Sequence, residues 1–179
     1  MKVKKSSKGF TLVEMIVAIA ISGIFCSIVL AISVTSGKLF SNVQSESNFN
    51  DKARIIISTI EDDLRVAKDI KGSNGIVSKD INIAGNTYKL SSSESIGEII
   101  VTYTKSGVAY AYILSSGNIC KYKADPSNTL NRVGGGFSEV NKMSILKEDD
   151  GTKYDVTIEL KNKKGETMTF TDVITPRNS

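Results

Sequence analysis

Apolar and polar residues alternate in three different ways along the chain, and each pattern predicts a different kind of element. Residues 10–34 form an almost continuous apolar run, in which Glu14 is the only charged residue. At about 1.5 Å per residue, this run makes a helix of roughly 37 Å, longer than the hydrocarbon core of a bilayer, which is about 30 Å. The first pattern therefore predicts a membrane-spanning helix.

The second pattern continues this helix as an amphipathic one. Apolar residues recur at intervals of three and four, which is the spacing of one helix face: Ala53, Ile56, Ile57, Ile60, Leu64 and Ala67. The helix is expected to end at Gly72, with residues 73–75 as the following loop. The consecutive acids Glu61, Asp62 and Asp63 point in different directions on a helix, so we expect a solvated face rather than a metal site.

The third pattern, over residues 73–179, is one of short strands separated by turns. Turn signals stand at 85–86, 106–107, 116–118, 149–151 and 163–165. Between them lie three strands within 98–124 and further strands around 143–146, 153–161 and 167–175, whereas residues 125–136 read as a loop. The pattern favours an antiparallel sheet with the helix across one face, an α+β fold.

Two groups of side chains in this region are better explained by structural roles than by ligand binding. The strand tyrosines Tyr103, Tyr110, Tyr112 and Tyr122 are expected to pack across the sheet rather than to stack on nucleic acid. Asp125, Asn128 and Asn131 do not have the spacing of a calcium loop, so we expect turn chemistry there.

The net charge changes the interpretation of the N-terminus. The 179-residue chain has 23 basic and 19 acidic residues, a net charge of +4, and four lysines precede the apolar run: Lys2, Lys4, Lys5 and Lys8. Without them, basic and acidic residues balance, which argues against a nucleic-acid partner. Lysines before an apolar segment hold that end in the cytoplasm.

The composition also excludes several kinds of catalytic site. The chain has no histidine, so histidine catalysis and histidine metal sites are excluded. Cys26 and Cys120 lie in the apolar run and in a strand, so we expect two free thiols. An enzyme with a catalytic carboxylate pair would need two acidic side chains that converge in a cleft. The candidate pair Asp149-Asp150 instead has the sequence pattern of a turn. We therefore expect no enzyme, no metal and no cofactor.

Four interpretations of the apolar run compete. A secretory signal has a shorter apolar region, and a lipoprotein needs a small residue before its cysteine, whereas Phe25 precedes Cys26. A plain single-pass anchor leaves Glu14 unexplained, because a carboxylate in hydrocarbon costs about 2.5–3.5 kcal/mol. The fourth rests on the segment KGFTLVE (8–14), which follows a short basic leader and precedes the apolar run. This segment resembles the signature of the type IV prepilin family.

The resemblance assigns roles to individual residues. It implies that a prepilin peptidase cuts between Gly9 and Phe10 and methylates the new amine of Phe10, and that Glu14 neutralises the N-terminal amine of a neighbouring subunit. Buried charges are costly when unpaired, so such a pair would act as a register device. The implied divisions are a leader (1–9), a transmembrane and filament-core half of the helix (10–35), an amphipathic half (36–72) and a β-sheet domain (73–179).

The resemblance also implies a pilin fold and a function. The segments EDDLRVAKDI (61–70) and PRN (176–178) are similar to minor pilins and pseudopilins of the J/W type. The expected function is a minor pilin that primes assembly or sits at the tip. Its expected partners are other pilin subunits, the prepilin peptidase and an inner-membrane assembly platform. It would lie in the cytoplasmic membrane before assembly and in a cell-surface pilus afterwards. A type II secretion or competence pseudopilin, and a membrane-anchored binding protein, are the alternatives.

Overall fold

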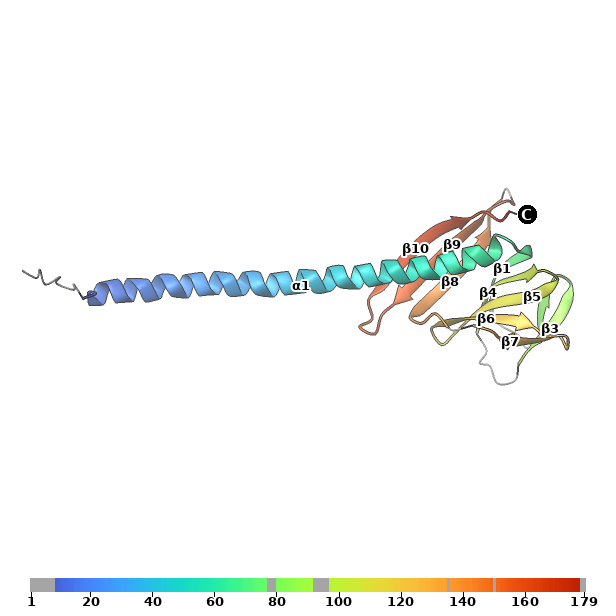
Figure 1. Cartoon of the computed structure of the whole chain (residues 1–179), viewed down its shortest axis with the longest axis horizontal. Coiled ribbons are helices and arrows are strands. Elements are labelled where there is room, and N and C mark those ends of the chain that lie inside the picture. Colours follow the sequence, from blue (N-terminus) through green and yellow to red (C-terminus); the bar gives the residue numbers. More distant parts are fainter. Residues whose placement is uncertain (1–8, 77–79, 92–96, 135, 150, 178–179) are drawn as a thin grey trace, which may run out of the picture. The chain divides into compact units, whose positions relative to one another are not determined.

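The chain forms one long helix followed by a β-rich region. The computed structural model describes residues 9–76, 80–91, 97–134, 136–149 and 151–177. The chain divides into two compact units, Met1–Asn48 and Phe49–Ser179. Helix α1 (Leu12–Leu64) supplies the described helical part of the first unit and the first element of the second (Figure 1). The predicted α+β fold with a long N-terminal helix is confirmed.

Helix α1 is shorter at its C-terminal end than the apolar spacing predicts. It ends at Leu64 instead of Gly72, and residues 68–76 form strand β1 (Lys68–Ile76), including the segment 73–75 that was expected to be a loop. Strand β1 pairs antiparallel with β4 (Glu98–Lys105). An added Cβ on Gly72 would lie 1.9 Å from the Ile145 carbonyl oxygen, so this glycine allows two backbones to approach. Pairing with β4 has overridden the local helical pattern.

The strands form two sheets rather than the single antiparallel sheet that was expected. The larger has the order β1-β4-β5-β6-β7-β3-β2, and the smaller has the order β10-β9-β8. Pairing is antiparallel except between β3 and β7, which run parallel. The remaining strands are β2 (Asp80–Ile83), β3 (Asn86–Leu90), β5 (Val108–Ser115), β6 (Asn118–Ala124), β7 (Thr129–Arg132), β8 (Val140–Lys147), β9 (Tyr154–Lys161) and β10 (Thr167–Ile174). Strand β7 lies inside the predicted loop 125–136, because it pairs with β6 and β3.

Two-residue turns close three hairpins of the larger sheet. Both central residues have positive φ in each, as a type I′ turn requires: Ala84-Gly85, Ser106-Gly107 and Ser116-Gly117. The last two turns are confirmed where they were predicted, and the first is shifted by one residue from the expected Gly85-Asn86. These turns join β2 to β3, β4 to β5 and β5 to β6 by two residues each.

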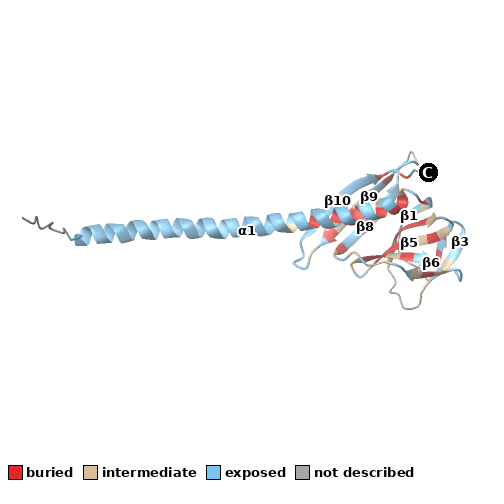
Figure 2. Cartoon of the chain, viewed as in Figure 1, coloured by how far each residue is buried: buried red, intermediate tan, exposed pale blue. Residues whose placement is uncertain are grey.

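The core of the second unit lies between the last turns of α1 and the two sheets. The predicted apolar stripe is buried: Ala53, Ile56, Ile57, Ile60, Leu64 and Ala67 (Figure 2). It packs with residues of both sheets in one cluster, whereas a second cluster, which includes Ile81 and Leu130, consists of residues of the larger sheet alone. Burial of the stripe fixes α1 to the β-rich region.

Candidate functional site

The first unit presents an apolar helix with no cover. Residues 9–44 are all exposed, and Phe10, at the N-terminal end, is 83% exposed. The helix is long and apolar enough in this part to cross a membrane. A continuous apolar surface of this size needs lipid or other apolar helices around it. This is the transmembrane helix that the sequence predicts.

The polar side chains of this apolar segment are satisfied within the helix. The hydroxyls of Ser22, Ser33 and Thr35 each donate to the carbonyl oxygen four residues earlier, at 2.8–2.9 Å, and that of Ser27 donates to the Ile24 carbonyl at 2.7 Å. Hydroxyls bonded in this way place no unpaired donor in hydrocarbon. The segment can therefore enter a bilayer or a helical bundle with few unpaired polar groups.

Glu14 has a partner in its own chain, which the sequence interpretation missed. Thr11 precedes the first helical residue, and its N–H and hydroxyl donate to Glu14 Oε2 at 2.8 and 2.9 Å. The Glu14 N–H donates in return to Thr11 Oγ1 at 3.3 Å. This reciprocal arrangement is a capping box, and its sequence signal, a threonine three residues before a glutamate, was visible.

The capping box leaves part of the Glu14 carboxylate available. Both bonds from Thr11 end on Oε2, and among the described residues Oε1 accepts none. Gly9 and Phe10 lie just outside the helix, exposed and without regular secondary structure, so the Gly9–Phe10 bond is accessible. Lys2, Lys4, Lys5 and Lys8 lie outside the described residues.

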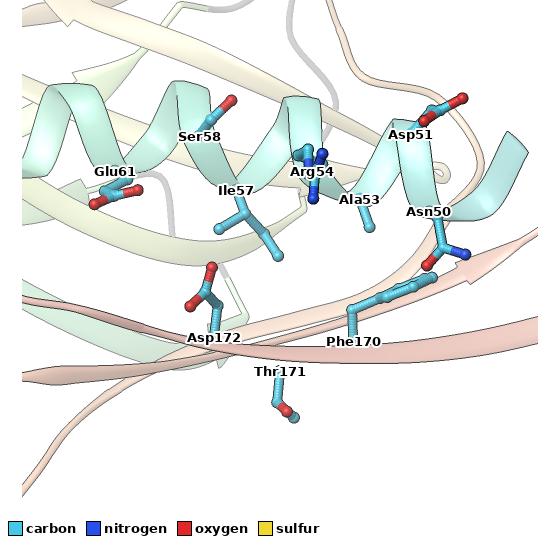
Figure 3. A pocket seen from close by; sticks show the side chains of 10 residues that line it. All are labelled: Asn50, Asp51, Ala53, Arg54, Ile57, Ser58, Glu61, Phe170, Thr171 and Asp172. Carbon is cyan, nitrogen blue, oxygen red and sulfur yellow. The ribbon is translucent and has the colours of Figure 1, made fainter. Parts of the chain in front are cut away.

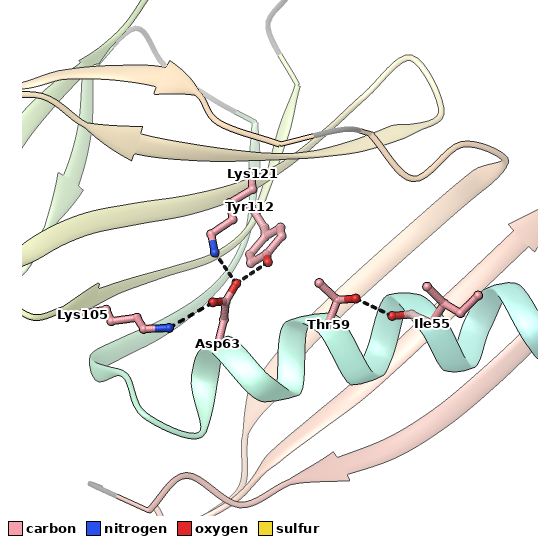
Figure 4. Close-up of polar contacts among 6 residues, drawn as sticks. All are labelled: Ile55, Thr59, Asp63, Lys105, Tyr112 and Lys121. Atoms are coloured by element: carbon pink, nitrogen blue, oxygen red, sulfur yellow. Dashed lines mark hydrogen bonds and ion pairs between the residues drawn. The ribbon is translucent and has the colours of Figure 1, made fainter.

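The second unit contains a buried charge that the sequence pattern placed in solvent. Asp63, in the last turn of α1, points towards Tyr112 and Lys121 (Figure 4), and it is only 9% exposed, which corrects the expectation of a solvated face. Lys121 Nζ lies 2.5 Å from Asp63 Oδ2, the Tyr112 hydroxyl donates to the same oxygen at 2.6 Å, and Lys105 Nζ lies 3.5 Å from Oδ1. Its neighbours Glu61 and Asp62 are not buried. Only the packing of three strands against α1 decides which acid is enclosed.

This environment shifts the pKa values of the groups that share it. Burial by itself would raise the pKa of Asp63, but hydrogen bonds from Lys121 and Tyr112 and the charge of Lys121 outweigh it, so that this pKa lies below its ordinary value. Burial, together with the nearby negative charge of Asp63, raises the pKa of Tyr103 and Tyr112. The cluster is therefore a charged carboxylate held by the neutral phenol of Tyr112 and by two lysine side chains.

Three of the four strand tyrosines stack across the sheet as the pattern predicts, and the fourth, Tyr122, is buried in the second core cluster. The rings of Tyr103 and Tyr110 lie 5.3 Å apart and nearly parallel, and those of Tyr103 and Tyr112 lie 6.3 Å apart. Lys121 Nζ lies 5.2 Å from the centre of the Tyr110 ring, a cation–π geometry. The Tyr103 hydroxyl is buried and has no hydrogen-bond partner among the described residues. The aromatic stack thus lies against Lys121, the lysine that pairs with Asp63.

Two other predicted features have simple structural roles. Asp125 accepts bonds from the backbone N–H groups of Ser127 and Thr129 and from the Asn131 side chain, the turn chemistry that was expected. Hydrogen bonds from the Ser127 hydroxyl and the Thr129 N–H hold the pKa of Asp125 below its ordinary value. Neither Cys26 nor Cys120 forms a disulfide, in line with the prediction. In the described ranges, no group of three His, Cys, Asp or Glu side chains is placed to hold a metal ion.

Comparison with known proteins identifies the N-terminal segment. A family model, the prokaryotic N-terminal methylation motif, matches residues 4–32. No curated protein and no solved structure matches the chain. The N-terminal part is therefore type IV prepilin-like, with a methylation motif followed by an apolar helix that can span a membrane. The match ends within α1 and does not reach the β-rich unit.

Proposed function

We propose that this chain is a minor pilin of a type IV pilus, made as a membrane-anchored precursor. A prepilin peptidase would cut between Gly9 and Phe10 and methylate the Phe10 amine. The observation that carries this proposal is the methylation motif at 4–32, which includes the first part of an exposed apolar helix. The accessible backbone at Gly9–Phe10 supports cleavage at that bond.

Glu14 would act at the contact between subunits. The new N-terminal amine of Phe10 and the Glu14 carboxylate both lie in an apolar environment, where an unpaired charge is costly. Glu14 Oε1, which has no partner among the described residues, is the atom to receive the amine of a neighbouring subunit, while Oε2 keeps the cap. Pairing of the two charges would set the register of packed helices.

The leader would keep the precursor in place before cleavage. Lysines at 2, 4, 5 and 8 favour a cytoplasmic N-terminus and a β-rich unit on the opposite side of the cytoplasmic membrane. After processing, the subunit would leave the membrane for a cell-surface filament. The partners of this pathway are other pilin subunits, the prepilin peptidase and an inner-membrane assembly platform, and the role is structural rather than enzymatic.

The minor subtype is supported by two short segments. EDDLRVAKDI (61–70) and the C-terminal PRN (176–178) resemble minor subunits of the J/W type, which favours a role in priming or at the tip. A subunit of a type II secretion or competence pseudopilus would have the same anchor and the same processing. A membrane-anchored binding protein would instead keep residues 1–9.

The first test is the N-terminal peptide of the protein isolated from its native cells. Mass spectrometry should find a chain that begins at N-methylated Phe10. A chain that still carries Met1 to Gly9, in cells with an active prepilin peptidase, would contradict the proposal and favour the plain anchor.

The second test separates the charge of Glu14 from its capping bond. Glu14→Ala removes both, whereas Glu14→Gln keeps an acceptor for the Thr11 N–H and removes only the charge. Both variants should be processed and inserted normally, and both should be absent from sheared filaments. Normal incorporation of Glu14→Gln would contradict a need for the charge, and if Glu14→Ala were still excluded, the cap would be what assembly requires.

A further inference from the structure

An open groove separates α1 from the edge of the smaller sheet. It has a volume of about 420 Å³ and lies entirely within the second unit, lined by Asn50, Asp51, Ala53, Arg54, Ile57, Ser58 and Glu61 of α1 and by Phe170, Thr171 and Asp172 of β10 (Figure 3). Phe170 and Asp172 point towards the helix, and Thr171 points away from it. One wall of the groove is therefore the outermost strand of a sheet.

Strand β10 has an open hydrogen-bonding edge. It is the terminal strand in the order β10-β9-β8 and pairs only with β9. The Asn162 N–H donates to the Glu166 carbonyl at the base of the hairpin, and hydrogen-bonded pairs alternate from there along an antiparallel ladder. In the observed register, Thr169 and Thr171 then turn their N–H and C=O groups away from β9. In the described part of the chain, no other strand meets them.

The sequence of β10 offers little protection for this edge. Natural edge strands are often blocked by lysine, proline, a bulge or a covering element. The strand TMTFTDVI has no lysine, proline or glycine, and its pairing with β9 has no register shift. Its one charged residue, Asp172, accepts the Val173 N–H at 2.8 Å and so covers a single outward donor. The outward N–H and C=O groups of Thr169 and Thr171 have no such cover in the described part of the chain.

We propose that this edge binds an extended segment of a partner protein, which adds to the smaller sheet as a fourth, antiparallel strand. The partner backbone would bond with the outward groups of Thr169 and Thr171. Side chains directly opposite each other in a sheet lie on the same face. Partner residues opposite Phe170 and Asp172 would therefore point into the groove beneath α1.

The lining of the groove defines the chemistry of this segment. Phe170, Ala53 and Ile57 form an apolar side, which fits an apolar residue opposite Phe170. Glu61 is paired with Arg65, so the remaining charged residues of the lining are the acids Asp51 and Asp172 and the base Arg54. The excess of negative charge favours a lysine or arginine opposite Asp172. The occupant is an extended segment in which apolar and basic residues alternate with polar ones.

The inference concerns only the second unit and stands apart from the proposed function. It holds whether or not residues 1–9 are removed. A second copy of the chain that pairs through its own β10 would place Asp172 and its neighbouring acids on both sides of the contact, which the charge of the groove disfavours.

The test uses the full-length chain in detergent micelles and a synthetic peptide, Val-Thr-Lys-Thr-Val-Thr-Val. In the antiparallel arrangement the third residue of the peptide, lysine, lies opposite Asp172, and its fifth residue, valine, lies opposite Phe170. Hydrogen exchange followed by NMR should show about tenfold slower exchange of the Thr169 and Thr171 amides with peptide at millimolar concentration. A peptide N-methylated at its three threonines should give no protection. Unchanged exchange at both amides, or protection that depends on protein concentration alone, would overturn the proposal.

A charge exchange tests the chemistry of the partner. Asp172→Lys should weaken binding of the lysine peptide about fivefold, and replacement of that lysine by glutamate should restore it for this variant. Asp155→Lys is the matched control, because Asp155 is exposed on β9 opposite Val173, which is the face away from α1. Equal binding of both peptides to the native chain and to Asp172→Lys would contradict the proposed charge complementarity.

Discussion

Two carboxylates of α1 show how differently the same residue type can be held. Glu14 is bound by Thr11 in the adjacent turn, so three residues of sequence are enough to satisfy it. Asp63 is bound by Tyr112 and Lys121, which are about 50 residues further along the chain. It also lies at the C-terminal end of a helix, where the dipole disfavours a negative charge. Its position therefore depends on strands β5 and β6.

Removal of the Thr11 hydroxyl should loosen the start of α1. In Thr11→Val, the Glu14 N–H loses its acceptor and the carboxylate loses one donor, at a cost of about 1 kcal/mol. Amide exchange at residues 12–15 in micelles should become about fivefold faster. Thr35→Val is the control, because its hydroxyl bonds only within the helix interior. Equal effects of the two substitutions would argue against the capping box.

Asp63→Asn should destabilise the second unit in a pH-dependent way. The loss of charged hydrogen bonds from Lys121 and Tyr112 should cost about 2 kcal/mol at pH 7 in urea unfolding. Because the folded pKa of Asp63 is lowered, its charge contributes fully above the unfolded pKa, about 3.9, and that contribution fades as pH falls through the folded pKa. The difference between variant and native chain should therefore shrink below pH 4.

Asp62→Asn is the matched control for this measurement. Asp62 is the preceding residue of the same helix and is exposed, so its substitution should change the unfolding free energy by less than about 0.5 kcal/mol. A constant difference between Asp63→Asn and the native chain down to pH 3 would show that the charge of Asp63 is not what stabilises the unit.

At the scale of elements, strand β1 links the two sheets. It pairs with β4 of the larger sheet, and Gly72 lies against the backbone of Ile145 in β8 of the smaller one. The Tyr154 hydroxyl of β9 also donates to the Ile70 carbonyl of β1, at 3.2 Å. Residues 68–72, which were expected to end the helix, are thus part of a strand that contacts both sheets.

Gly72→Ala should weaken this junction. The new methyl group would lie 1.9 Å from the Ile145 carbonyl oxygen, so one backbone must move, at a cost of about 1–3 kcal/mol in urea unfolding. Gly134→Ala is the control, because the nearest atom to its added Cβ is a Lys121 side-chain carbon at 3.7 Å. A neutral Gly72→Ala would mean that β1 and β8 do not approach as closely as described.

At the scale of the whole molecule, the two units differ in what they need from their surroundings. The unit Phe49–Ser179 buries the apolar stripe of α1 in its own core. The described residues of Met1–Asn48 bury almost nothing within the chain and depend on lipid or on other helices. Anchoring and folding are therefore separable.

A chain that begins near residue 35 should be soluble and should unfold cooperatively. It keeps the whole stripe from Ala53 to Leu64 and both sheets, and loses only the apolar segment. Tyrosine near-UV circular dichroism and urea unfolding would check this. A chain that begins at residue 66 lacks most of the stripe and should aggregate or lose its fixed tertiary signal. Aggregation of the longer chain would contradict the assignment of the core.

The sequence by itself determined the features that depend on neighbours along the chain. The apolar run, the stripe from Ala53 to Leu64, the glycine turns and most strands follow from spacing and turn chemistry, which act over a few residues. The match over residues 4–32 likewise rests on one contiguous segment. The capping box at Thr11 and Glu14 belongs to the same local class and was detectable in principle.

Only the tertiary structure decided the features that depend on distant partners. Pairing with β4 made residues 68–76 a strand, although their local pattern predicted the end of a helix at Gly72 and a loop after it, and pairing with β6 and β3 made β7 a strand within an expected loop. The burial of Asp63, the division into two sheets and the open edge of β10 have the same origin. Each depends on which segments meet in space, and hydrophobic spacing within one segment carries no information about its partner.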